Sequence, residues 1–200
     1  MDVAGNLASG HPMLFDHPSF AASDLRERAA RLLIASAPMT QLTLGDAMII
    51  VDSMEPVFVT MGTVVMEEGE TEDTGYMALV LEGELRAESG NGIAGENLVI
   101  SMIGPGSLLG DMGAIDGSPR SATCTALTDV KLAILSSAML LALIDSHPAV
   151  ASRLLLAICT GMSARLRENN RRLLALSNVT RAVQLELDAT HSVNRRLLGA

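Results

Sequence analysis

The sequence predicts an α+β fold in which an antiparallel β-sandwich or β-barrel lies between N-terminal helices and a long C-terminal helix. Three observations support this prediction. Apolar residues follow a helical period over residues 24–54, short β-rich segments separated by turns follow, and the helical period returns after Leu135. Short strands at this spacing are typical of antiparallel sandwiches and barrels.

An N-terminal arm and two helices precede the β-rich region. Residues 1–18 hold Gly, Ser, His and Pro without periodicity, and we expect a loose arm there. The sequence favours a helix over Asp24–Ser36 with Ser23 as its N-cap. A second helix is expected from Thr43 to about Met54, beginning with a capping box of Thr43 and Asp46.

Seven short segments rich in β-branched and other apolar residues follow the second helix. Glycines separate several of them, as expected for tight turns. We expect strands at Val57–Thr60, Val64–Glu67, Tyr76–Leu81, Glu84–Ala87, Asn97–Met102, Ser121–Leu127 and Val130–Leu135.

Two further helices and a short terminal one are expected after the last strand. Ser137 is expected to cap a helix that ends near Ser146, and Pro148 to open the next helix at its first position. We expect that helix to end near Leu176, where Ser177-Asn178 breaks it, and a short helix to follow over Val179–Leu198.

The helix over residues 149–176 carries apolar residues at alternating spacings of four and three, which is the pattern of a coiled-coil seam. A symmetric homodimer would cover this seam. Packing of the stripe on the chain's own β-domain is the alternative. The seam consists of Leu155, Cys159, Met162, Leu166, Asn169, Leu173 and Leu176.

Composition excludes several classes of protein. The first 147 residues carry 20 acidic and 6 basic side chains, which would repel a polyanion, whereas residues 148–200 carry 8 basic and 3 acidic ones. No uninterrupted apolar run approaches the roughly 18 residues of a membrane span, and the N-terminus does not resemble a secretion signal. We therefore expect a cytoplasmic protein without a membrane partner.

The histidines and cysteines argue against a metal centre or an enzyme. No histidine lies between residues 41 and 135, which excludes a three-histidine metal site built from the strands. Two cysteines cannot hold a four-cysteine iron–sulfur cluster. No cofactor, metal or catalytic residue is therefore expected. A haem held through Cys124 or His147 is the alternative, and no motif in the sequence supports it. The residues concerned are His11, His17, His147, His191, Cys124 and Cys159.

One glycine-rich stretch carries the chemistry of a ligand site. Gly110-Asp111-Met112-Gly113 is followed, nine residues after Asp111, by Arg120 at the start of a predicted strand. Glycine allows the backbone to approach a ligand closely, and the planar arginine fork can hold a phosphate bidentately. Such a stretch can be a simple turn, but the combination with Arg120 favours a site for a sugar hydroxyl beside a phosphate.

The segment Leu109–Ala114 with Ser118–Thr123 resembles the phosphate-binding cassette of the cyclic nucleotide-binding domain family, whose pattern is F-G-E-x-(A/G)-L followed by P-R-x-A-T. The resemblance covers about residues 40–190 and is nearest to catabolite-activator-like bacterial regulators. It implies a cupin-like jelly-roll β-barrel and a cyclic nucleotide ligand, which we expect to be cAMP. Two departures concern the ligand: Asp111 replaces a glutamate and Leu109 replaces an aromatic residue.

The resemblance also implies a role for each matching residue. Asp111 would accept the ribose 2′-hydroxyl, and Arg120 would pair with the cyclic phosphate. Asn169 would read the purine edge with its neighbour, or would instead fix the register of the dimer. The full set of expected ligand-binding residues is Ser101, Gly110, Asp111, Met112, Gly113, Arg120, Ser121, Ala122, Arg165, Asn169 and Asn170.

These expectations combine into a homodimeric sensor. We expect residues 1–40 to form the arm and first helix, residues 41–147 the ligand-binding barrel, and residues 148–200 the dimerisation helix and terminal helix. The sequence after residue 180 does not complete a helix-turn-helix domain, so we expect signalling through an unidentified effector protein rather than DNA binding by this chain alone. The alternatives are a ligand-free dimeric interaction module with a degenerate pocket, and a transcription factor that uses the basic segment Arg165–Arg172.

Overall fold

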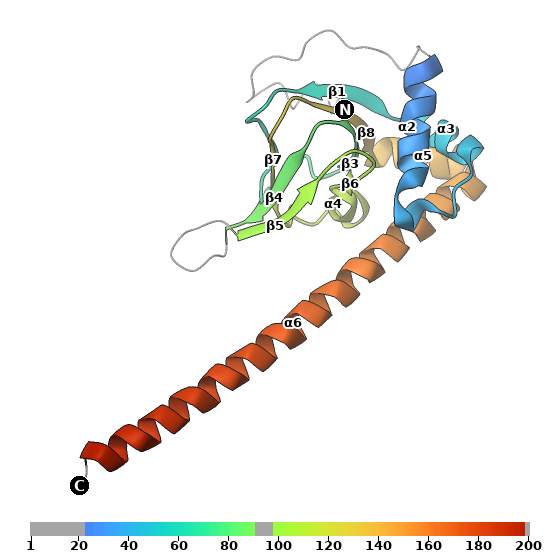
Figure 1. Ribbon diagram of the computed structural model, residues 1–200. Coiled ribbons are helices and arrows are strands. Elements are labelled where there is room, and N and C mark those ends of the chain that lie inside the picture. The colour runs from blue at the N-terminus through green and yellow to red at the C-terminus, as the bar shows by residue number, and fades with distance from the viewer. Residues whose placement is uncertain (1–22, 91–97, 199–200) are drawn as a thin grey trace. The chain divides into compact units, whose positions relative to one another are not determined.

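The computed structural model describes residues 23–90 and 98–198, and these form the predicted α+β fold (Figure 1). The arm expected at residues 1–18 lies outside the described residues. The chain divides into two compact units, residues 1–158 and residues 159–200. The first unit contains both β-sheets and the helices before and directly after them.

Two helices and one short 3₁₀ helix precede the strands. Helix α2 spans Ser23–Ala35, η1 spans Ala37–Met39 and α3 spans Leu44–Asp52. The predicted capping box of α3 is confirmed, because the Thr43 hydroxyl accepts from the Asp46 amide at 3.1 Å. In return, the Asp46 carboxylate accepts from the Thr43 amide at 2.9 Å. Two of the first amides of α3 are satisfied in this way.

Eight strands form two four-stranded antiparallel sheets, with the orders β1-β8-β3-β6 and β2-β7-β4-β5. All seven expected strands are present, within two residues of most predicted ends. The eighth strand, β6, has only two residues and was not predicted. The strands are β1 Glu55–Val59, β2 Val64–Met66, β3 Tyr76–Glu82, β4 Leu85–Ser89, β5 Leu98–Ile103, β6 Leu108–Leu109, β7 Thr123–Ala126 and β8 Val130–Ser136.

The inner faces of the two sheets enclose the core of the barrel. Alternate residues of β7 are buried, as expected for strands with one inward face, whereas β3 is buried on both faces because helices cover its outer side. The core is aliphatic, in keeping with a composition that is only 2% aromatic. It is built from residues of both sheets, among them Val57, Val80, Leu85, Ala126, Val130 and Leu132.

Helix α5, Ser137–Ser146, begins one residue earlier than predicted. Its N-cap is Ser136 rather than Ser137, because the Ser136 hydroxyl accepts from the Met139 amide at 3.2 Å. The prediction that Ser137 is the cap was therefore wrong. The Ser137 hydroxyl instead donates to the Ala114 carbonyl at 2.7 Å, which ties α5 to the short helix α4, Asp111–Asp116.

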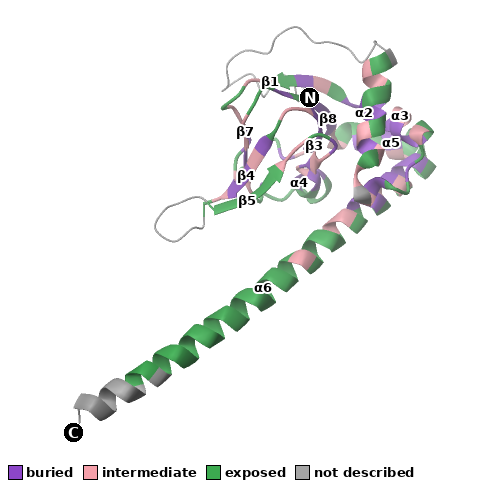
Figure 2. Cartoon of the chain, in the orientation of Figure 1, coloured by how far each residue is buried: buried purple, intermediate pink, exposed green. Residues whose placement is uncertain are grey.

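Helix α6 runs without interruption over Pro148–Leu198. The predicted break at Ser177-Asn178 was wrong, because two weak helix formers cost only about 1 kcal/mol within a long helix of strong formers. Pro148 stands at the first position, as expected. From Leu166 onward the described side chains of α6 are mostly exposed (Figure 2), including Leu173 and Leu176 at 63% each.

The first turns of α6 belong to the first unit and pack there. Ala151, Leu154 and Ile158 are at most 2% exposed and form a stripe at helical spacing. Judged by length and composition alone, Pro148–Asp188 is apolar enough to cross a membrane, with a mean hydropathy of 1.3 in one 18-residue window. Within the structure, 28% of that window is buried.

Candidate functional site

Arg120 is a charged residue in the interior of the barrel, with only 5% of its surface exposed. Its backbone is fixed by two hydrogen bonds to the turn between β2 and β3. The Arg120 amide donates to the Glu70 carbonyl at 3.0 Å, and the Gly69 amide donates to the Arg120 carbonyl at 2.9 Å. The side chain therefore leaves the backbone from a rigid position at the start of β7.

Neutral main-chain carbonyls hold the Arg120 guanidinium. Nη1 donates to the carbonyl of Tyr76 at 3.1 Å and to that of Gly110 at 3.3 Å, and Nη2 donates to that of Asp73 at 3.2 Å. In the part of the chain that the structure describes, the buried Nε has no hydrogen-bond partner. An Nε–H and the adjacent Nη–H form the edge that binds carboxylates and phosphates bidentately. Arg120 therefore retains a buried donor on this edge.

The glycines of the cassette make room for this guanidinium. Gly110 has a positive φ of 74°, and a Cβ atom there would lie 2.7 Å from Nη1 of Arg120 and 2.6 Å from Cε of Met66. A Cβ atom at Gly113 would lie 3.2 Å from the same Nη1. The glycines were expected to let the backbone approach a ligand closely. In this structure the group that lies close to Gly110 and Gly113 is the guanidinium of Arg120.

Asp111 is the second charged residue of the cassette and is 7% exposed. It is the first residue of α4, and its Oδ1 accepts from the Met112 amide at 3.1 Å. Met112 is 44% exposed and Ser121 is exposed, whereas Ala122 packs against the barrel core. The fold thus brings Gly110, Asp111, Gly113 and Arg120 together.

A row of side chains crosses the inner face of the second sheet beside the cassette. The strand registers place Ser101 opposite Ala87, Ala87 opposite Cys124, and Cys124 opposite Met66. Directly opposed residues point to the same face of a sheet, so Ser101 lies on the same face as Ala87 and Cys124. Unlike these two residues it is exposed, because it lies on the edge strand β5. Its hydroxyl donates to the Met102 carbonyl at 3.2 Å. Burial raises the pKa of the Cys124 thiol, which therefore stays protonated.

Glu68 connects the turn between β2 and β3, which holds the backbone of Arg120, to the end of β4. The Glu68 carboxylate accepts from the Gly90 amide and from the Ser89 hydroxyl, both at 2.7 Å. These hydrogen bonds, the backbone one first, lower the pKa of Glu68. The sequence did not single out this residue or Tyr76 as part of the site. Tyr76 contacts Arg120 from 44 positions earlier in the sequence, so no local motif could have identified this pair.

Arg165, Asn169 and Asn170, expected to contact the purine, lie on α6 in the second unit. All three are exposed. Their contribution to a site on the first unit remains a prediction.

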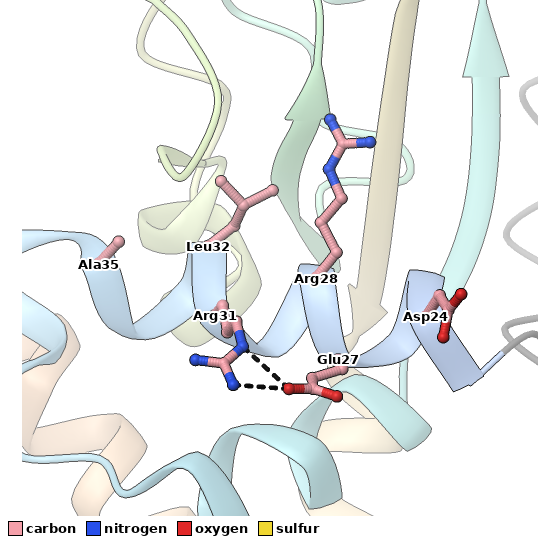
Figure 3. Close-up of a pocket in the computed structure, with 6 residues that line it drawn as sticks. All are labelled: Asp24, Glu27, Arg28, Arg31, Leu32 and Ala35. Atoms are coloured by element: carbon pink, nitrogen blue, oxygen red, sulfur yellow. Dashed lines mark hydrogen bonds and ion pairs between the residues drawn. The ribbon is translucent and has the colours of Figure 1, made fainter.

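The described surface also contains an open groove of about 530 Å³ along helix α2 (Figure 3). Arg31 and Glu27 form an ion pair at its wall, with 2.6 Å between Nη2 and Oε1. The other lining residues are Asp24, Arg28, Leu32 and Ala35. None of the lining residues belongs to the cassette. Within the described ranges, no group of three or more His, Cys, Asp or Glu side chains could hold a metal ion.

Comparison with known proteins links the barrel to one family. The family model described as cyclic nucleotide-binding domain matches residues 56–147. A cyclic nucleotide-gated potassium channel of Mesorhizobium japonicum is 36% identical over 121 residues, which cover 60% of this chain and 31% of the channel. A cyclic nucleotide-gated potassium channel of Rhizobium etli is 33% identical over the same shares. The match thus spans about a third of the length of these relatives.

Solved structures give the same result for the fold. A cyclic nucleotide-binding domain from Methylobacillus flagellatus has a TM-score of 0.67 and 25% identity, covering 76% of this chain and 84% of that one. The catabolite activator protein of Thermus thermophilus has a TM-score of 0.61 and 27% identity, covering 70% of this chain and 63% of that one.

Proposed function

We propose that this chain, whose residues 56–147 belong to the cyclic nucleotide-binding domain family, is a regulatory protein that binds cAMP in its β-barrel. The observation that carries the proposal is Arg120, which is 5% exposed and whose Nε has no hydrogen-bond partner among residues 23–90 and 98–198. A buried cation without a counter-charge costs several kcal/mol. A cyclic phosphate supplies both the counter-charge and the missing acceptor.

The remaining cassette residues fit the other parts of the nucleotide. In the proposed complex Arg120 binds the phosphate, and Asp111 accepts the ribose 2′-hydroxyl. The purine lies toward residues of α6 from the same chain or from the partner chain. The lining is proposed to comprise Ser101, Gly110, Met112, Gly113, Ser121 and Ala122 around the ribose phosphate, and Arg165, Asn169 and Asn170 around the purine.

Helix α6 supports a homodimer as the assembled form. Because the helix continues through Ser177-Asn178, the four–three spacing of the seam extends from Leu176 to Thr180, Val183 and Leu187. Val183 and Leu187 are 50% and 47% exposed in the single chain. A second copy of the same helix would bury this long exposed seam in a symmetric coiled coil.

The proposed dimer acts in the cytoplasm by signalling to an effector protein rather than by catalysis. The channel relatives contain this domain within a much longer protein, which supports a regulatory role for the domain. In residues 98–198, the part that follows the barrel consists of α5 and α6 and includes no helix-turn-helix. Asp111, one methylene shorter than the family glutamate, favours one alternative: a dimeric interaction module that no longer binds a nucleotide.

Mass spectrometry of the nucleotide carried through purification separates these two functions. The protein is purified without added nucleotide, denatured, and its small molecules identified, and thermal unfolding is then followed with added cAMP or cGMP. We expect bound cAMP, or a rise in the melting temperature with cAMP that exceeds that with cGMP. An empty protein that no cyclic nucleotide stabilises would favour the interaction module.

A further inference from the structure

Tyr76 contacts Arg120 with both its ring and its backbone. Cζ of Arg120 lies 4.4 Å from the centroid of the Tyr76 ring, within the range of a cation–π interaction. The carbonyl of the same tyrosine accepts from Nη1 of Arg120 at 3.1 Å. One residue therefore fixes the guanidinium from its face and from its end.

The Tyr76 ring is itself held rigidly. The residue is 3% exposed, and its hydroxyl donates to the Val65 carbonyl on β2 at 2.9 Å. Its backbone pairs with Ser136 of β8. Burial, the largest cause, raises the pKa of the Tyr76 hydroxyl to about 12, so the ring stays neutral and its hydroxyl remains a donor at physiological pH. The ring is thus anchored to strands of both sheets.

These contacts leave one part of the guanidinium unused. The ring covers one face of Arg120, and three carbonyls occupy the two Nη groups. The Nε–H remains without a partner among the described residues. A cation–π contact is stronger where water is excluded. The buried Tyr76 ring therefore favours the one rotamer of Arg120 that stacks on it, and this rotamer places this Nε–H where an anion would bind.

We propose that Tyr76 is a positioning residue that holds the Arg120 guanidinium with its Nε edge ready for the cyclic phosphate. This inference rests on the function proposed above, because the phosphate is the ligand that Arg120 is held to receive. Tyr76 itself does not contact the phosphate in this scheme. Its effect on affinity passes through Arg120.

The composition of the chain provides a direct test of the stacking. Tyr76 is the one tyrosine of the sequence, which has no tryptophan, so tyrosine fluorescence and the tyrosine band of the near-ultraviolet circular dichroism report on this ring. We expect Arg120→Gln to change both signals in ligand-free protein with an unchanged far-ultraviolet spectrum, and Arg31→Gln, on the exposed face of α2, to leave them unchanged. Identical signals in wild type and Arg120→Gln would overturn the stacking whether or not a nucleotide binds.

The affinity for cAMP tests the positioning role. Tyr76→Phe keeps the ring and should bind cAMP within about threefold of wild type, whereas Tyr76→Leu should bind at least about tenfold more weakly. Val57→Ala serves as the control, because Val57 belongs to the same buried core cluster as Tyr76. If Tyr76→Leu does not fold, Tyr76→Met replaces it.

The outcomes separate the two proposals. Wild-type affinity in the variants without a ring, or a loss no larger than that in Val57→Ala, would overturn the positioning role. Absence of cAMP binding by the wild-type protein would contradict the proposed function, while the spectroscopic comparison would still decide whether Arg120 stacks on Tyr76.

Discussion

Gly110 and Arg120 approach so closely that no side chain fits between them. A Cβ atom at Gly110 would lie 2.7 Å from Nη1 of Arg120 and 3.0 Å from the Tyr76 carbonyl, at a φ that L-residues rarely adopt. The glycine and the arginine are ten residues apart in the sequence, yet they form a single structural unit through the hydrogen bond from Nη1 to the Gly110 carbonyl.

Substitution of this glycine tests the unit. We expect Gly110→Ala to lower the free energy of unfolding by about 2–4 kcal/mol, from strain at positive φ and from overpacking. Gly117→Ala is a matched control, since Gly117 also has a positive φ but has no atom within 4 Å of an added Cβ. Gly117→Ala should lower the free energy of unfolding by only about 1–2 kcal/mol. Urea unfolding measures both, and equal losses would show that the close approach is unimportant.

The role of Asp111 can be isolated with a modified ligand. If its carboxylate accepts the ribose 2′-hydroxyl, Asp111→Asn should weaken cAMP binding by about tenfold, since a hydrogen bond to a charged group contributes about 1.5–3 kcal/mol. Binding of 2′-deoxy-cAMP, which lacks this hydroxyl, should change little between the two proteins. Calorimetric titration of both ligands gives the comparison. An equal loss for the two nucleotides would contradict this assignment.

The dimer seam makes a prediction about two adjacent leucines. Leu173 lies on the proposed seam and Leu174 does not, although they are 63% and 67% exposed in the single chain. Leu173→Asp should convert the dimer to a monomer, because two buried aspartates would face each other across the seam. Leu174→Asp should remain a dimer. Analytical ultracentrifugation distinguishes the masses, and a monomeric wild-type protein would contradict the proposed assembly.

The pair of Asp46 and Arg153 predicts how stability depends on pH. Arg153 donates to both oxygens of Asp46, at 2.6 and 3.1 Å, and with the Thr43 amide it lowers the pKa of this carboxyl below its usual value near 3.9. A carboxyl with a lowered pKa in the folded state stabilises the protein above the unfolded pKa, and this contribution disappears as the pH falls through the folded pKa.

Asp46→Asn should therefore lower the free energy of unfolding by about 1–3 kcal/mol at pH 7, and by progressively less below about pH 4. Glu27→Gln, which removes an exposed ion pair on α2, should cost less than about 1 kcal/mol. Urea unfolding at several pH values provides the measurement. A loss that is constant down to pH 2 would show that the charge of Asp46 does not stabilise the fold.

The strands and most helix ends were predictable because their signals are local. The capping box of Thr43 and Asp46 is a four-residue pattern, and the glycines between strands mark turns regardless of the rest of the chain. The two-residue strand β6 was missed because Leu108–Leu109 has no periodicity of its own, and pairing with β3 alone makes it a strand. The continuation of α6 through Ser177-Asn178 likewise depends on the whole helix.

The site was only partly predictable for the same reason. Arg120 and the cassette glycines form a contiguous pattern, so the sequence identified them. Tyr76 lies 44 residues before Arg120, and Met66 lies 44 residues before Gly110, so only the arrangement of the strands brings Tyr76 to the guanidinium and Met66 to the cassette glycine. A tyrosine at the start of a strand is otherwise indistinguishable from an ordinary core residue.

The most direct test of the proposed function is calorimetric titration of cAMP into the wild-type protein and into Arg120→Gln, with Arg31→Gln as a control for the loss of one positive charge. We expect saturable binding by wild type and by Arg31→Gln. Arg120→Gln should bind cAMP at least about a hundredfold more weakly, because it lacks the buried guanidinium that provides the counter-charge of the phosphate. An absence of binding by the wild-type protein at millimolar cAMP, or equal affinity in Arg120→Gln, would contradict it.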